Sequence, residues 1–326
     1  MTNDAPSSDS AEPGRSAPPG DVHVGRDGYL FLSGGRHGVF RLFSGEANPT
    51  ASSPSTFIQN QAARAEACAQ DGRAYRMVVF PEKCVTLADR IEGQGELSSL
   101  YERHYRDGVD AASGLADRVI YPLAELAGID APFDRTDTHL SIAGAEAVAR
   151  RLVGDLLPDQ QEALAAGIAD NSKEREVSGD LGSKFDPPVT ELRRVLPRPA
   201  SQRMASNGIR GGNDGILVLL EAPDSSTDAT LLIFGDSFFR AMLPMLGLVW
   251  RRIVFCRTRF FHPEMVRAMK PDHVLGGVAE RYLSRCEPDA MRPHFLAYPL
   301  ILGRATDPDP DFPEMWNTFF DREALL

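Results

Sequence analysis

Cysteine is scarce in this sequence, and no apolar run is long. The four cysteines among 326 residues are widely spaced and form no Cys-x-x-Cys pair: Cys68, Cys84, Cys256 and Cys286. Their spacing supports neither a zinc site nor a disulfide framework, so we expect buried or incidental thiols. The longest uncharged apolar stretch, residues 241–250, is too short to cross a bilayer, and we expect a core helix there.

Basic residues are outnumbered by acidic ones. Lys and Arg total 35 against 46 Asp and Glu, which gives a net charge of -11. A broad nucleic-acid-binding face needs a surplus of Lys and Arg, so this class of function is excluded. The sequence also lacks a Walker A motif, a Gly-x-Gly-x-x-Gly turn after a strand and a His-Glu-x-x-His motif. Nothing in it therefore indicates a nucleotide cofactor or a zinc-protease site.

The first twenty residues lack the basic start and apolar core of a secretory signal. They are rich in Ser, Pro, Asp, Gly and Ala, a composition typical of a disordered tail. We therefore expect a tail over residues 1–20 and a single domain over residues 21–326, with a long polar insertion at about 158–215. The expected compartment is, by default, the cytoplasm.

Short apolar segments alternate with helical patterns along the chain. We predict a helix over residues 141–157, with Ser141 as its N-cap and Pro158 after its end. Strands are predicted at 74–80, 215–220, 230–234 and 253–256, and a further strand from residue 273. This alternation predicts an α/β fold with a central, mostly parallel sheet flanked by helices.

One segment places a serine where chemistry is feasible. In LLIFGDSFFRAML, residues 231–243, an apolar strand runs into Gly235-Asp236-Ser237 and a helical pattern follows. Such a strand-to-helix turn presents the serine to the crevice at the carboxyl end of a sheet, with backbone N–H groups that can face an oxyanion. We expect Gly235 to permit a tight backbone there. The competing interpretation is an ordinary turn with Asp236 or Ser237 as the helix N-cap.

A serine nucleophile needs a base and a group that orients the base. His139 stands just before the predicted helix, and Asp137 precedes it by two residues. This spacing lets Asp137 bind one ring nitrogen and leaves the other facing Ser237. The competing interpretation is turn chemistry at a solvated helix start. His262 and His273 have no such carboxylate just upstream, and we expect a helix-start or surface residue and a packing residue, respectively.

Together these elements resemble the SGNH-hydrolase-like domain of the alginate O-acetylation proteins and their relatives. In that family an Asp-x-His motif precedes the Gly-Asp-Ser block, the reverse of the usual SGNH order, and this chain has the same order. Leu140 stands where the family usually has Trp. Further segments resemble family elements in the same order: VGRDGYLFL at 24–32, VVFPEK at 78–83, SGDLGSK at 178–184 and KPDHVLGGVAERYL at 270–283.

The resemblance implies an acyl-transfer mechanism in which Ser237 attacks, His139 is the base and Asp137 orients His139. The Ser237 N–H would be one oxyanion donor. No metal or bound organic cofactor is required. Five further residues are candidates for oxyanion or substrate binding: Gly235, Asp236, Asn213, Arg257 and Arg259.

Three functions remain open at this stage. They are O-acetyl transfer to a polysaccharide or other glycan hydroxyl, hydrolysis of a carbohydrate or acetyl ester by the same triad, and non-catalytic glycan binding or scaffolding. The expected partners are a hydroxyl acceptor and an acetyl donor. Whether a membrane-bound protein delivers the acetyl groups is left open at this stage. Members of the family usually carry a membrane anchor or export signal and act on exported polysaccharide, whereas this sequence shows neither.

Overall fold

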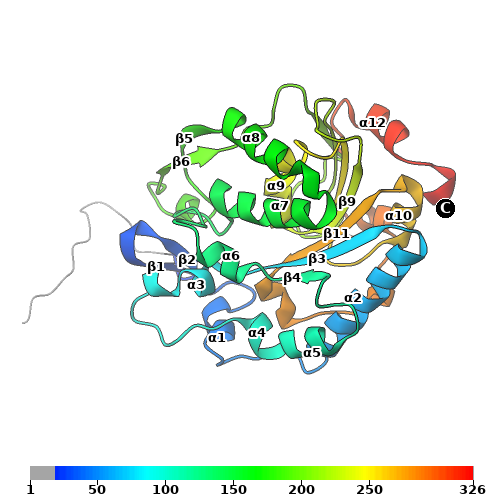
Figure 1. The fold of residues 1–326 in the computed structure, drawn as a ribbon. Helices are drawn as coiled ribbons and strands as arrows, with labels where there is room; N and C mark the ends of the chain where they lie inside the picture. Colours follow the sequence, from blue (N-terminus) through cyan, green and yellow to red (C-terminus); the bar gives the residue numbers. More distant parts are fainter. Residues whose placement is uncertain (1–18, 326) are drawn as a thin grey trace, which may run out of the picture.

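The computed structural model describes residues 19–325, so most of the tail predicted over residues 1–20 lies outside the described residues. A seven-stranded sheet forms the centre of the fold, and helices lie on both sides of it (Figure 1). Its strands are β3 (Ala74–Phe80), β4 (Val119–Ile120), β7 (Arg203–Ser206), β8 (Leu217–Glu221), β9 (Thr230–Gly235), β10 (Arg252–Arg257) and β11 (His273–Ala279).

The sheet has the spatial order β4-β3-β11-β9-β10-β8-β7. The first five strands run parallel to their neighbours, and β8 and β7 add an antiparallel edge. β9 and β10 are almost wholly buried because their Leu, Ile, Val and Phe side chains meet helices on both faces. The predicted class, an α/β fold with a mostly parallel central sheet, is confirmed.

Helices α7, α8 and α9 pack together on one side of the sheet, and α2 packs against β3 on the other (Figure 1). The predicted helix over residues 141–157 is α7, in which the Ser141 side chain caps the Gly144 N–H. None of the helices within residues 19–325 is long and apolar enough to span a membrane. The helices are α1 (Val39–Phe43), α2 (Ser53–Gln70), α3 (Lys83–Thr86), α4 (Leu100–His104), α5 (Arg106–Ala111), α6 (Leu123–Ala127), α7 (Ile142–Leu156), α8 (Gln161–Asn171), α9 (Ser237–Leu246), α10 (Pro263–Met269), α11 (Tyr298–Ile301) and α12 (Phe312–Phe319).

Two small antiparallel hairpins lie outside the central sheet. β1 (Val22–Val24) pairs with β2 (Leu30–Leu32), as the Gly-Arg-Asp-Gly turn between them suggests. β5 (Lys173–Val177) pairs with β6 (Glu191–Val195), and both lie in the polar stretch 158–215, which also supplies α8 and the edge strand β7. The sequences KEREV and ELRRV carry mostly charged side chains, so apolar patterning gave no sign of this second hairpin.

The polar segments that matter for chemistry follow the carboxyl ends of neighbouring parallel strands. Lys83 comes soon after β3, Ser237 after β9, Thr258 after β10 and Glu280 after β11. Since these strands are adjacent and parallel, the segments that follow them meet at one edge of the sheet. This edge is where the candidate site is found.

Candidate active site

Ser237 is the first residue of α9, and Asp236 is the N-cap of that helix. The Asp236 carboxylate accepts hydrogen bonds from the Phe238 N–H at 2.9 Å and from the Ala279 N–H at 2.6 Å. Asp236 therefore fixes the turn to both α9 and β11. The Ser237 side chain is partly exposed, and its N–H, at the first helical position, has no partner within the helix.

Gly235 is needed for a reason different from the one expected. Its φ does not lie in the left-handed region, so the backbone alone does not require glycine. A Cβ at this position would lie 2.9 Å from Phe239 Cδ2 and 3.1 Å from the Gly277 carbonyl oxygen. Glycine is required because β9, β11 and α9 approach one another closely, which corrects the expectation of a tight backbone.

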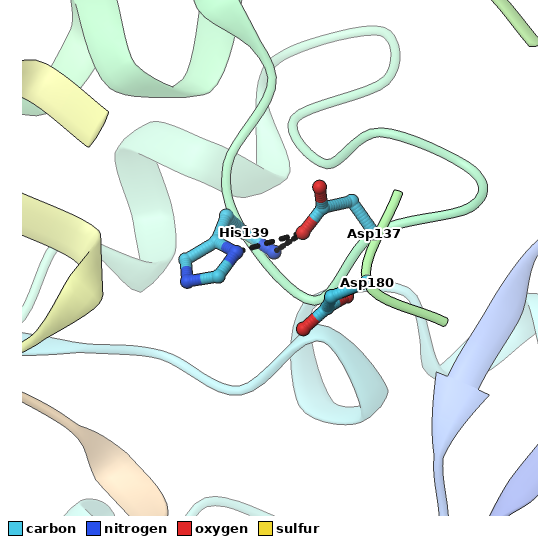
Figure 2. Close-up of side chains that lie close together, drawn as sticks. All are labelled: Asp137, His139 and Asp180. Carbon is cyan, nitrogen blue, oxygen red and sulfur yellow. Dashed lines mark hydrogen bonds and ion pairs between the residues drawn. The ribbon is translucent and has the colours of Figure 1, made fainter. Parts of the chain in front are cut away.

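Asp137 and His139 lie side by side in the loop before α7. Asp137 Oδ1 accepts hydrogen bonds from the His139 backbone N–H at 3.0 Å and from His139 Nδ1 at 2.7 Å (Figure 2). The second ring nitrogen, Nε2, faces away from Asp137 (Figure 2). Because Nδ1–H donates a hydrogen bond to the carboxylate, neutral His139 carries its lone pair on Nε2.

The pair is also electrostatically coupled. Burial raises the pKa of Asp137, but the hydrogen bonds and positive charge of His139 outweigh burial and hold this pKa well below its usual range. Burial lowers the pKa of His139, but the hydrogen bond and charge of Asp137 raise it by more, so it lies above its ordinary value of 6.5. The site therefore stabilises a protonated imidazole. A general base needs this stabilisation because it holds a proton during the reaction.

His139 lies over the start of α9. Its ring centroid is 5.0 Å from that of Phe238, the residue after Ser237. His139 Nε2 is buried and has no hydrogen-bond partner within residues 19–325, and no hydrogen bond there joins it to Ser237. A buried ring nitrogen without a partner near the start of α9 can accept a proton, and catalytic hydrogen bonds are often long until substrate binds.

The conformation of residues 134–139, which we call the Asp-His loop, depends on carboxylates from the polar stretch 158–215. Asp180 accepts hydrogen bonds from the Thr138 N–H at 2.8 Å and the Thr138 hydroxyl at 2.6 Å. Glu191 accepts from the N–H groups of Arg135 and Thr136 at 2.9 and 2.8 Å. The sequence analysis missed both supports: SGDLGSK was noted only as a family-like segment, and Glu191 gave no signal.

Asp137, His139 and Asp180 also raise the question of a metal, because ligand atoms of the three lie within 4.8 Å of one another. Their hydrogen bonds fit a different role. Both Asp180 oxygens accept from Thr138, and His139 Nδ1 donates to Asp137 Oδ1. Nδ1 carries a proton in this arrangement and is not free for a metal, so we interpret the group as a hydrogen-bonded loop.

One small cavity adjoins the turn before Ser237, and a larger cavity adjoins the small one. The smaller, of about 40 Å³, has Gly235, Asp236, Asn213 and Arg259 in its wall. The larger, of about 320 Å³, shares five residues with it: Asn213, Asp214, Arg259, Val278 and Tyr282. Arg257 does not line either cavity but donates a hydrogen bond to Asn213 Oδ1 at 2.9 Å. Four of the five further candidates of the sequence analysis thus line the smaller cavity, and Arg257 bonds to one of the four.

His262 forms a second histidine–carboxylate pair that the sequence analysis missed. It precedes α10 as expected but is fully buried, so the alternative of a surface residue is wrong. Its Nδ1 lies 3.0 Å from Glu264 Oε1 and its Nε2 lies 3.3 Å from Thr258 Oγ1. The partner carboxylate lies two residues downstream of His262. The pattern that predicted the Asp137–His139 pair has its carboxylate upstream, so it did not predict this one. His273 packs beside Trp250, whose Nε1–H donates to its Nδ1 at 3.1 Å.

The comparisons with known proteins concern the fold. No protein-family model matches the chain, and no curated protein does. Among solved structures, PatB1 of Bacillus cereus is 10% identical with a TM-score of 0.54, over 73% of this chain and 93% of PatB1. PatB1 with a sulfonyl adduct is 9% identical with a TM-score of 0.55, and the match covers 73% of this chain and 91% of that structure. The O-acetyltransferase domain of Pseudomonas putida AlgJ is 17% identical with a TM-score of 0.47, and the match covers 87% of this chain and 99% of the AlgJ domain.

At these identities the likeness to PatB1 shows a shared fold. The chain shares this α/β fold, which agrees with the resemblance drawn from the sequence.

Proposed function

We propose that this protein is a serine-dependent O-acetyltransferase that moves an acetyl group to a hydroxyl of a glycan. One observation carries the proposal. His139 donates from Nδ1 to Asp137 at 2.7 Å, and its buried Nε2 is unpartnered among the described residues beside the first turn of α9, where Ser237 lies. This is the base-and-orienter arrangement that activates a serine.

The first half-reaction forms an acetyl-enzyme. His139 Nε2 takes the Ser237 hydroxyl proton while Ser237 Oγ forms a bond to the acetyl carbonyl carbon. Asp137 stabilises the imidazolium that results, and the Ser237 N–H at the start of α9 donates to the oxyanion. When the tetrahedral intermediate collapses, the bond from the acetyl carbon to the donor's leaving atom breaks, and His139 returns the proton to that atom.

The second half-reaction transfers the acetyl group. His139 Nε2 takes the proton of an acceptor hydroxyl, the acceptor oxygen attacks the acetyl carbon, and the ester bond to Ser237 breaks. The proton then returns to Ser237 Oγ. Water in place of the acceptor would give hydrolysis, so the outcome depends on what occupies the space beside Ser237.

The 320 Å³ cavity supports a hydroxyl-rich acceptor. Its wall contains amides and charged groups that can bind sugar hydroxyls, among them Asn60, Gln61, Asp214 and Arg259. Asp214 Oδ1 is buried and has no hydrogen-bond partner within the described residues, so it can accept a bond from a ligand. A cavity that offers several donors and acceptors suits a polyol better than an apolar alcohol.

The fold neighbours supply further support. The neighbouring AlgJ domain is an O-acetyltransferase by its own description, and PatB1 has been solved with a sulfonyl adduct. Sulfonylating reagents trap nucleophilic side chains, of which an activated serine is one. A nucleophile of the same kind in this chain would be Ser237.

The test is acetyl release from an aryl acetate, with the wild type compared with Ser237→Ala. We expect loss of the enzyme-dependent rate in a folded Ser237→Ala protein. The matched control is Ser55→Ala, because Ser55 is exposed and also lies in the first turn of a helix. Equal rates in Ser237→Ala and Ser55→Ala would contradict the proposal.

A second measurement separates transfer from hydrolysis. The wild type is incubated with the aryl acetate and a series of oligosaccharides, and mass spectrometry locates the acetyl group. Acetylated oligosaccharide that forms only with Ser237 present supports transfer. Acetate as the sole product identifies an esterase with the same triad, and no labelling of Ser237 by a sulfonyl fluoride would identify a binding protein instead.

A further inference from the structure

Lys83 binds backbone carbonyl groups of the Asp-His loop. Its side chain is 3% exposed, at the start of α3, which follows β3. The ammonium group donates hydrogen bonds to the carbonyl oxygens of Asp134 at 2.6 Å, Arg135 at 3.0 Å and Asp137 at 2.8 Å. An ammonium group has three N–H donors, and all three are used on this one loop.

No carboxylate within residues 19–325 forms an ion pair with Lys83. The rings of Tyr29 and Phe31 lie with their centroids 5.3 and 5.4 Å from Nζ, so the charge is held by carbonyl dipoles and aromatic faces. Burial lowers the pKa of Lys83 to about 7, although nearby carboxylates, first Glu191 and then Asp137, raise it. A charge buried at such a cost is kept where it has a definite contact to make.

The loop has almost no regular structure that would fix its conformation. Carboxylates bind its N–H groups, as described above, and Lys83 binds its carbonyl groups. The bond to the Asp137 carbonyl bears directly on the site, because the orientation of that peptide sets the direction from Asp137 to His139. In this orientation Asp137 Oδ1 lies 2.7 Å from His139 Nδ1.

The position of Lys83 is itself fixed from the end of β11. Arg281 donates two hydrogen bonds to the Glu82 carboxylate, at 2.7 and 2.9 Å, and both side chains are buried. The Glu82 N–H donates to Glu280 Oε2 at 3.1 Å. The segment that carries Lys83 is therefore anchored independently of the Asp-His loop.

We propose that Lys83 is a positioning residue, which holds the carbonyl groups of the Asp-His loop so that Asp137 orients His139 toward Ser237. The expected effects on kcat and KM rest on the proposed function. The hydrogen bond between Asp137 and His139 can be observed without any activity, so the two proposals can fail separately.

The experiment compares the full-length wild type with Lys83→Ala and Lys83→Met. Proton NMR follows the deshielded Nδ1 proton of His139, and aryl-acetate kinetics give kcat and KM. We expect the resonance to disappear or move in both variants, and kcat to fall about 100-fold with little change in KM, since misplacement of a reacting group by about 1 Å has effects of this size. Lys83→Met retains most of the apolar stem and removes the ammonium group near Tyr29 and Phe31, so it tests that group alone if Lys83→Ala does not fold.

Chemical rescue tests the role more sharply. Ethylammonium can enter the space vacated in Lys83→Ala, and we expect it to restore part of both kcat and the Nδ1 resonance, whereas potassium chloride at equal ionic strength does not. The matched control is Lys270→Ala, because the Lys270 side chain is exposed and, within residues 19–325, bonds only to Asp321. A folded Lys83→Met protein with the kcat and resonance of the Lys270 variant would overturn the proposal.

The outcomes for the two proposals are distinct. If the wild type has no acetyl-transfer or hydrolytic activity but loses the resonance on Lys83→Met substitution, the function fails and the positioning role stands. If Ser237-dependent activity is present and unaffected by Lys83→Met, the function stands and the positioning role fails.

Discussion

Replacement of Asp137 by Asn tests the centre of the site. The variant removes the negative charge 2.7 Å from His139 Nδ1 and offers an amide that can present a donor to that nitrogen. The resulting tautomer would carry its proton on Nε2, so the nitrogen proposed to take the Ser237 proton could no longer accept one. We expect activity to fall for both reasons.

The magnitude follows from the geometry. Opposite charges about 4 Å apart at an effective dielectric constant of about 20 attract by about 4 kcal/mol. If the imidazolium of the transition state loses this interaction, kcat falls about 10³-fold. The direction of the pH dependence follows as well. Because Asp137 raises the pKa of His139, the rise of activity with pH, as His139 loses its proton, moves to lower pH in the variant.

The assay is aryl-acetate hydrolysis from acidic to alkaline pH, together with an NMR titration of His139. Asp134→Asn is the matched control, since Asp134 lies in the same loop with 12% of its side chain exposed, against 13% for Asp137. Asp134 pairs with Arg193 and does not bond to His139. The reasoning is refuted if Asp137→Asn keeps the kcat of Asp134→Asn, or if its pH profile rises at the same pH as that of the wild type.

Two further predictions follow. Aryl-acetate activity should be unchanged after dialysis against EDTA, because Asp137, His139 Nδ1 and Asp180 are engaged in hydrogen bonds and the proposed mechanism uses no metal, and a loss that zinc restores would contradict this interpretation. Arg281→Met should lower the free energy of unfolding by about 3–5 kcal/mol, because Glu82 would be left as an unpaired buried charge. Urea denaturation measures this loss, and a change within experimental error would show that Glu82 finds another partner.

The main strands could be predicted because they are continuous apolar runs that end at turn residues. β3 has the predicted bounds of residues 74–80, and β9 extends the predicted 230–234 by one residue. Buried parallel strands need apolar side chains on both faces, so their sequences are distinctive. The β5–β6 hairpin has no buried face of this kind, and only its position in the folded chain reveals it.

The candidate site was predictable in its local part. Asp137 and His139 are two residues apart, and that spacing alone makes their hydrogen bond feasible. The contacts of Lys83, Asp180 and Glu191 with the Asp-His loop join residues more than 40 positions apart. No local pattern encodes such contacts, because they depend on how the sheet edge and the polar stretch 158–215 come together.

The supports of the Asp-His loop also have a consequence for the order of folding. The loop is made before residue 140, but its amide groups find their carboxylates only at Asp180 and Glu191, and its histidine meets α9 only after residue 237. A nascent chain that ends at α7 would contain Asp137 and His139, but it would lack the residues that fix their positions. The site is therefore among the last parts of the protein to mature, because its contacts close long chain segments.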